Sequence, residues 1–215
     1  TLITNAMVYK VTTDASTGKA SGVMYIDRNT REVKEVRARV VIVCAQALES
    51  ARILLNSAPG GLGNSSGVLG HYLMDHLWVA GGAAGTFPDA PAPKPSLANP
   101  RRPNGIYAIR MHNTASGPRH KDFIRGFGYQ GGGSTTFNMN APGFGAAFKK
   151  GVLDPVTSVN LAGFGEMLAR YDNFVEIDPN TVDVYGIPAL RITVSWGENE
   201  KKMIPAMAET AAEMM

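Results

Sequence analysis

Residues 38–77 read ARVVIVCAQALESARILLNSAPGGLGNSSGVLGHYLMDHL, and this stretch decides the fold. Residues 40–45 form a continuous apolar run rich in β-branched side chains, which predicts a strand buried on both faces, as in a parallel sheet. Ala45, Gln46 and Ala47 then turn the chain. Apolar residues recur at helical spacing over residues 48–56, and Glu49 complements the dipole of the helix expected there. Ligands of open α/β sheets bind where a strand ends against a helix N-terminus, so the turn is a candidate ligand site.

The composition narrows the class of protein. The chain has 215 residues, of which 44% are hydrophobic, and its 24 Gly and 13 Pro suit an α+β protein with many loops. The formal net charge of +3 favours neither nucleic-acid binding nor a basic membrane patch. No apolar run approaches the roughly 20 residues of a membrane-spanning helix. Cys44 is the single cysteine, so an intrachain disulfide is excluded, and we expect it to pack inside the buried strand.

The first part of the chain predicts a meander of strands that leads into the buried strand and its helix. The expected strands cover residues 1–11, 20–27 and 33–38. The segments DASTG and DRNT, which lie between them, are rich in residues that favour tight turns.

The composition changes after residue 71 to short apolar runs separated by Pro and Gly loops. Strands are expected at residues 77–80, 105–111, 123–129, 158–168, 173–177 and 189–196. The proline-rich residues 87–104 predict a long surface excursion, exposed to proteolysis. From Glu198 an amphipathic helix is expected, with Met203, Met207, Ala211 and Met214 on one face. The fold class is therefore α+β or α/β, with a second part built on an antiparallel sheet.

Several of these motifs resemble the glucose-methanol-choline (GMC) family of FAD-dependent oxidoreductases. One family block corresponds to the AQA turn at residues 45–47, the Glu49-Ser50 helix start and the LLxxS helix end at residues 54–57. The next block corresponds to the Gly-rich loop at residues 60–67 and to GHYLMDH at residues 70–76. The segment GEMLARYDNFVEIDP at residues 165–179 and the cluster at residues 183–188 resemble substrate-domain strands of sugar and polyol dehydrogenases.

The resemblance implies part of an FAD-binding Rossmann-like domain in residues 1–76 and a substrate-binding domain in residues 77–215. The implied cofactor-binding residues are Val8, whose backbone meets the adenine, and Ala45, Gln46 and Ala47 beside the flavin; at Gln46 the family more commonly has Gly. The implied reaction transfers hydride from an alcohol, sugar or polyol to FAD, with an electron-acceptor partner such as a cytochrome subunit.

The family's GxGxxG motif and catalytic histidine are not found here in their usual context. We therefore expect no catalytic residue in this chain, and we interpret it as an internal piece of a longer flavoprotein. The letters GxGxxG do occur at residues 126–131, but the next residues, GGSTTFNMNAPG, cannot begin a stable helix, so we expect a glycine-rich strand or loop. Two alternatives stay open: a non-catalytic α+β binding domain, and a nicotinamide-dependent reductase that uses this glycine run.

The histidines do not form a metal-ligand pattern. His71 and His76 are five residues apart, which is not the spacing of a helical metal pair, and no metal site is predicted. Asp75 and His76 could act as an acid/base pair or have a structural role near the cofactor. We expect His112 and His120 to lie solvated in a polar loop.

Two other polar residues could be mistaken for catalytic groups. Glu166 could face a sugar hydroxyl, but an ion pair with Arg170 or Arg191 is the commoner outcome. Ser57 lacks a nucleophile elbow, so serine hydrolase chemistry is unsupported.

Overall fold

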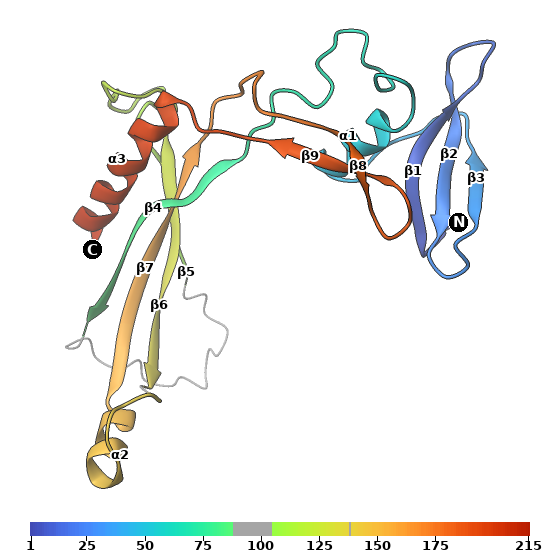
Figure 1. Ribbon diagram of the computed structural model, residues 1–215. Coiled ribbons are helices and arrows are strands. Elements are labelled where there is room, and N and C mark those ends of the chain that lie inside the picture. The colour runs from blue at the N-terminus through green and yellow to red at the C-terminus, as the bar shows by residue number, and fades with distance from the viewer. Residues whose placement is uncertain (88–104, 138) are drawn as a thin grey trace. The chain divides into compact units, whose positions relative to one another are not determined.

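The structure is a computed structural model that describes residues 1–87, 105–137 and 139–215 (Figure 1). Nearly all of the predicted proline-rich excursion, residues 88–104, lies outside the described residues. The described chain is mixed α and β, and its strand pairs are antiparallel, which confirms the predicted α+β class with antiparallel sheets. It forms two compact units: unit 1 contains Thr1–Met74 and Ala169–Ser195, and unit 2 contains Asp75–Leu168 and Trp196–Met215.

Unit 1 contains the predicted meander. Strands β1 (Ala6–Thr13), β2 (Ala20–Asp27) and β3 (Val33–Arg37) pair in that order. Helix α1 (Ala47–Leu55) lies where the helical periodicity placed it, and strands β8 (Phe174–Val182) and β9 (Pro188–Thr193) form a separate hairpin. The sequence-based division grouped this hairpin with the second part, whereas in the structure it belongs to unit 1. The buried apolar side chains of the unit are Val11, Ile26, Ile53, Val175 and Ile187.

The expected buried strand at residues 40–45 is not formed. This segment is irregular, and Val40 and Ile42 are 73% and 79% exposed. Cys44 is exposed as well, so the prediction that it packs in a core was wrong. A parallel strand is buried only when neighbouring strands pair with it on both sides, and the described residues supply no such neighbours.

Unit 2 is built on a four-stranded sheet of order β4-β7-β6-β5. Its strands are β4 (His76–Phe87), β5 (Gly105–Met111), β6 (Phe127–Phe137) and β7 (Pro155–Glu166). Helix α3 (Glu198–Met214) packs on β4 and β7. As the periodicity predicted, Met203, Met207 and Ala211 are fully buried, although Met214 is 48% exposed. The predicted glycine-rich strand is confirmed, because residues 127–137 form β6 and no helix begins at residue 131.

Small residues in the sheet allow α3 to approach closely. A Cβ atom at Gly81 would lie 2.7 Å from the carbonyl oxygen of Ile204, and one at Gly165 would lie 2.9 Å from the sulfur of Met203. The Tyr129 hydroxyl donates to the carbonyl of Met207 at 2.6 Å, and burial raises the pKa of Tyr129 to about 12. The sheet and the helix therefore share one core, which contains no room for a side chain at the contact glycines.

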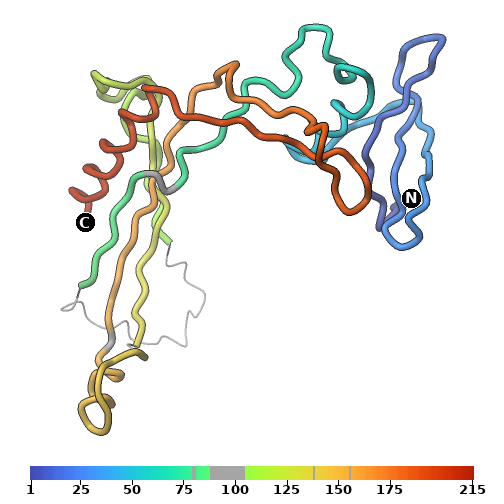
Figure 2. The backbone as a smooth tube through the Cα atoms, in the orientation of Figure 1, coloured from blue at the N-terminus to red at the C-terminus, as the bar shows by residue number. Residues whose placement is uncertain are grey.

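The β6–β7 hairpin continues beyond this core and is closed by helix α2 (Gly145–Leu153), which the sequence analysis did not predict (Figure 2). The helix is short and begins with Gly145, and Phe144 at its N-cap offers no side-chain hydrogen bond. Such a segment has a weak helix signal, because Gly and an uncapped N-terminus both disfavour a helix.

Candidate functional site

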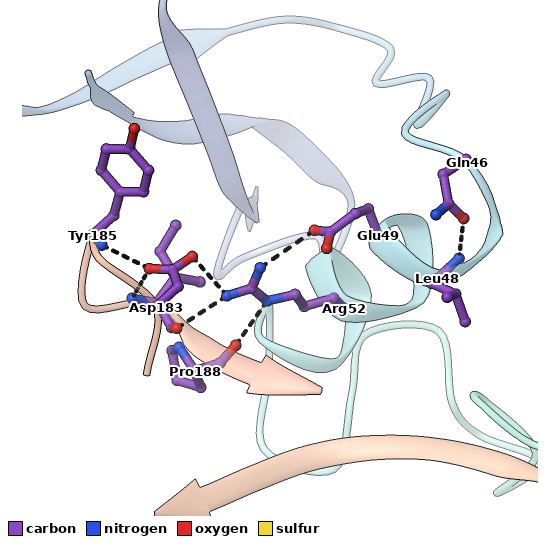
Figure 3. Close-up of polar contacts among 8 residues, drawn as sticks. Gln46, Leu48, Glu49, Arg52, Asp183, Tyr185 and Pro188 are labelled. Atoms are coloured by element: carbon purple, nitrogen blue, oxygen red, sulfur yellow. Dashed lines mark hydrogen bonds and ion pairs between the residues drawn. The ribbon is translucent and has the colours of Figure 1, made fainter. Parts of the chain in front are cut away.

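The turn before α1 has a strained centre. Gln46 adopts φ 61° and ψ 173°, a region of backbone space that is essentially restricted to glycine. Its side-chain Oε1 accepts a hydrogen bond from the N–H of Leu48 at 2.5 Å, which caps the helix (Figure 3). The backbone thus adopts the geometry that Gly would adopt easily, at the position where the sequence analysis noted Gln in place of Gly. Strain of this kind is found mostly at functional sites.

An apolar hollow of about 250 Å³ lies beside Ala45, the first residue of the turn. Val8 and Ala45, two of the predicted cofactor-binding residues, line it together with Val11, Val23, Val41, Ile42, Val43, Cys44 and Ile53. Val8 is in β1, which is an edge strand among the described residues. The pairing of β1 with β2 shifts register between Val8 and Lys10, so the backbone groups near Val8 are only partly used by the sheet.

A second hollow, of about 260 Å³, lies beside Ala47, the last residue of the turn. Ala47 lines it with Leu48 and Ala51 of α1, with Gly70, His71, Tyr72, Leu73 and Met74, and with Val175 of β8. Backbone hydrogen bonds from Val175 N–H to the Gly70 carbonyl and from Leu73 N–H to the Asn173 carbonyl, both at 2.9 Å, hold the 70–73 segment against β8.

Gly70 is required in this wall. Its φ is +88°, and a Cβ atom there would lie 2.2 Å from the carbonyl oxygen of Val175. Beside it, His71 stacks on Tyr171 with ring centroids 3.8 Å apart, and its Nδ1 lies 2.8 Å from the Tyr171 carbonyl oxygen. Any larger residue at position 70 would therefore push this segment away from β8.

Ser57 connects β1 to α1. Its buried hydroxyl accepts a hydrogen bond from the N–H of Val11 at 2.9 Å and donates to the carbonyl of Ile53 at 2.5 Å. The sequence analysis considered Ser57 only as a nucleophile. It missed this positioning role, because the partner is 46 residues away.

Arg52 fixes the opposite face of α1 to the β8–β9 turn (Figure 3). Its Nε donates to the Pro188 carbonyl at 2.8 Å, and its Nη2 donates to Asp183 Oδ2 at 2.9 Å and to the Ile187 carbonyl at 3.0 Å. Burial alone would raise the pKa of Asp183. The hydrogen bonds from Arg52 and from the N–H groups of Tyr185 and Ile187 together hold that pKa below its usual value. Helix α1 is therefore fixed at both faces, which fixes the turn that precedes it.

The residues around the turn fit parts of an extended cofactor with flat rings. Both hollows have apolar walls, and each is smaller than the roughly 300–1,000 Å³ of a complete small-molecule site. Neither would enclose a whole dinucleotide. A ligand that crosses residues 45–47 could place one ring system in each hollow.

Unit 2 has a more polar hollow, of about 230 Å³, on its sheet. Arg110 and Glu166 lie in it as a bidentate pair, with Nε–Oε2 3.1 Å and Nη1–Oε1 3.2 Å. Glu166 Oε2 also accepts from the N–H of Gly126 at 2.8 Å. The other lining residues are His76, Tyr107, Ala108, Phe127, Gly128, Tyr129, Gln130 and Phe164. The prediction that Glu166 pairs with Arg170 or Arg191 was wrong, because these arginines pair with Asp172 and Glu176.

The histidines do not gather at one place. His71 lines the second hollow of unit 1, and His76 lines the polar hollow of unit 2, where its ring meets that of Phe164 edge to face. His112 and His120 are not fully solvated as predicted, since His120 stacks on Phe123 at 3.9 Å. Burial lowers the pKa of His112, and the nearby His120 lowers it further. In the part of the chain that the structure describes, no group of three or more His, Cys, Asp or Glu could hold a metal ion.

The comparisons with known proteins agree with this arrangement. A family model described as GMC oxidoreductase matches residues 1–78, which include the strained turn and the 70–74 wall of the second hollow. The chain is 30% identical over 212 residues to 2-methyl-1,2-propanediol dehydrogenase from Mycolicibacterium austroafricanum, an alignment that covers 93% of this chain. The chain belongs to the GMC oxidoreductase family.

Other relatives of this GMC chain are also dehydrogenases by name. It is 24% identical to the gluconate 2-dehydrogenase flavoprotein of Pantoea cypripedii over 94% of its length. It is 29% identical over 98 residues to the fructose dehydrogenase large subunit of Gluconobacter japonicus, which covers 38% of this chain and 18% of that protein. The chain spans about a third of the length of the first two relatives, 37% and 34% respectively.

Proposed function

We propose that this GMC chain is part of an FAD-dependent oxidoreductase that oxidises a CH–OH group of an alcohol, sugar or polyol. One observation carries the proposal. Val8 and Ala45 line one apolar hollow and Ala47 lines another, while Gln46, which lines neither, joins Ala45 to Ala47 with glycine-like backbone geometry. The names of the relatives support it, since each is called a dehydrogenase of a hydroxylated compound or its flavoprotein.

In this proposal the chain holds FAD at two separate points. The hollow lined by Val8 takes the adenine end, where the partly unpaired backbone of β1 offers hydrogen bonds. Ala45, which the family resemblance places beside the flavin, lines this hollow as well. The hollow beside Ala47 takes the flavin end, against the apolar side chains of α1 and the 70–74 segment. FAD supplies the hydride acceptor when bound. The residues of the turn bring the backbone close to the ring, because Ala47 has only a methyl side chain.

The substrate would meet the sheet of unit 2. In its hollow, Glu166 can accept hydrogen bonds from hydroxyl groups and Arg110 can donate them. The pair is 35–39% exposed, so it keeps polar capacity for a ligand. We further propose that unit 2 binds the substrate and that a partner such as a cytochrome subunit takes the electrons. Residues 169–195, which the sequence analysis grouped with the substrate-binding domain, belong to unit 1.

Flavin content tests the cofactor site. Ala47→Leu adds three carbon atoms that point into the hollow, and we expect flavin per polypeptide to fall by at least about tenfold, equivalent to about 1.4 kcal/mol of binding. Ala146→Leu is the matched control, because Ala146 lies in the first turn of α2 and is exposed. Flavin is released by denaturation and quantified by fluorescence, and the thermal unfolding of each apoprotein is compared.

The outcomes separate this proposal from the main alternative. Equal flavin content in Ala47→Leu and the parent protein would remove the turn from the cofactor site. If the unmodified full-length protein purifies without flavin and does not bind added FAD, the result would support the non-catalytic α+β binding domain.

A further inference from the structure

The end of the β6–β7 hairpin extends away from the core of unit 2. Helix α3 contacts the sheet near Phe127, Tyr129 and Gly165, at one end of the hairpin. At the other end Phe137 pairs with Pro155, and residues 139–153, including α2, close the hairpin (Figure 1). The contact of α3 and the following Met215 with the sheet reaches Gly85, which lies level with Gly133 of β6. At about 3.3 Å per residue, the hairpin extends roughly 13 Å beyond this contact to Phe137.

Large apolar side chains of this closing segment face solvent. Phe144 is 92% exposed, Met139 is 72% exposed and Leu153 is 69% exposed, and Phe137 at the end of β6 is 59% exposed. No residue of α2 is buried. Single exposed apolar residues are normal on soluble proteins, but four in one hairpin end mark an interaction surface.

The segment keeps its own local fold while these side chains stay outside. Ala141 is only 8% exposed, and a Cβ atom at Gly151 would lie 2.9 Å from the Cβ of Ala141, so α2 packs on the preceding turn. Phe148 and Val152 are half-buried on this inner side. The exposed apolar side chains therefore do not pack into the small core of the segment.

All charged residues of this segment are positive. Lys149 and Lys150 are exposed, and the sequence contains no Asp or Glu from residue 137 to residue 153. Bulky apolar groups next to lysines on a protruding helix are typical of segments that lie in the interface of a bilayer with anionic lipids. A protein partner would need a concave, acidic surface to cover the same groups.

We propose that this hairpin end, Phe137 and residues 139–153, docks the protein on the surface of a membrane that contains anionic lipids. Phe144, Met139 and Leu153 enter the boundary between headgroups and acyl chains, while Lys149 and Lys150 contact lipid phosphates. This is attachment to one leaflet. No helix among the described residues is long and apolar enough to cross a membrane. The inference does not depend on the proposed oxidoreductase activity.

Vesicle flotation tests the inference with the purified, complete protein. It should float with vesicles of phosphatidylcholine and phosphatidylglycerol, and less with phosphatidylcholine alone. Lys149→Gln/Lys150→Gln should weaken binding to the anionic vesicles roughly 30-fold, and added salt should reduce the difference from the parent protein. Phe144→Ser should weaken binding to both vesicles by at least about tenfold. Because Phe144 is almost fully exposed, this variant should fold normally.

Matched variants elsewhere on the chain serve as controls. Lys19→Gln/Lys121→Gln removes the same charge from exposed sites, and Val184→Ser removes a side chain that is 79% exposed in the turn between β8 and β9. Neither should change vesicle binding. A parent protein that does not float with anionic vesicles would overturn the inference, as would equal losses in the control variants. A change of oligomeric state in Phe144→Ser, with unchanged vesicle binding, would assign the hairpin end to contact between copies of the chain instead.

Discussion

Replacing Arg52 by Met should destabilise unit 1 while leaving the stem of the side chain in place. The Arg52 side chain is 13% exposed, and its guanidinium makes hydrogen bonds to Asp183 and to the carbonyls of Ile187 and Pro188. The charged bond contributes about 1.5–3 kcal/mol and each carbonyl bond about 1 kcal/mol. Asp183 keeps a quarter of its surface exposed, so water replaces part of what it loses. We expect a loss of about 3 kcal/mol in the free energy of unfolding.

Urea unfolding followed by far-ultraviolet circular dichroism measures this loss. With a slope of about 1–3 kcal/mol per molar urea, the midpoint should fall by roughly 1–3 M at unchanged slope. Both tryptophans, Trp78 and Trp196, belong to unit 2, so their fluorescence gives a separate reference signal. Arg191→Met is the control, because the ion pair of Arg191 with Glu176 is short, at 2.6 Å, but exposed. Equal midpoints for the two variants would refute the argument that burial makes the Arg52 contacts strong.

Three further changes test the same region. Ser57→Ala should cost about 2 kcal/mol in urea unfolding, because the buried N–H of Val11 loses its acceptor. Gln46→Gly should be more stable than Gln46→Ala by about 1–3 kcal/mol in urea unfolding, because both variants lose the side-chain cap and only the Ala variant keeps the backbone strain. Asp183 has a lowered pKa in the folded chain, so its contribution to stability is complete above its unfolded pKa near 4 and is lost as the pH falls through the folded value. Asp183→Asn should lack this acid-dependent loss, and stability curves between neutral pH and pH of about 2 would show it.

Helix α1 and the buried face of α3 could be predicted because their patterns are local. The spacing of Leu48, Ala51 and Leu54 defines a helix whatever surrounds it. Residues 40–45 carry an equally clear apolar pattern, yet Val40 and Ile42 are exposed, since a strand depends on partners that its own sequence does not specify.

The same difference between local patterns and distant partners applies to the candidate site residues. The turn at residues 45–47 was found from the motif that it resembles, but its strain at Gln46 depends on three-dimensional packing. The partner of Glu166 was missed because it follows from the strand order, in which β6 lies between β7 and β5. The pair approaches across Gly126, where a Cβ atom would lie 2.8 Å from Arg110 Nε. Ser57 was missed for the same reason, since Val11 is distant in the sequence.

The two-part composition of unit 1 has a consequence for its synthesis. Arg52 and Asp183 are 131 residues apart, and all of residues 75–168 are made between the two parts of the unit. At about 5–20 residues per second, a ribosome needs roughly 7–26 s to deliver Asp183 after Arg52. During that interval α1 has no partner for its guanidinium, and the wall at Gly70 has no β8 to pair with. On the ribosome, therefore, the proposed cofactor site is begun first and completed late, after most of the inserted unit has already been made.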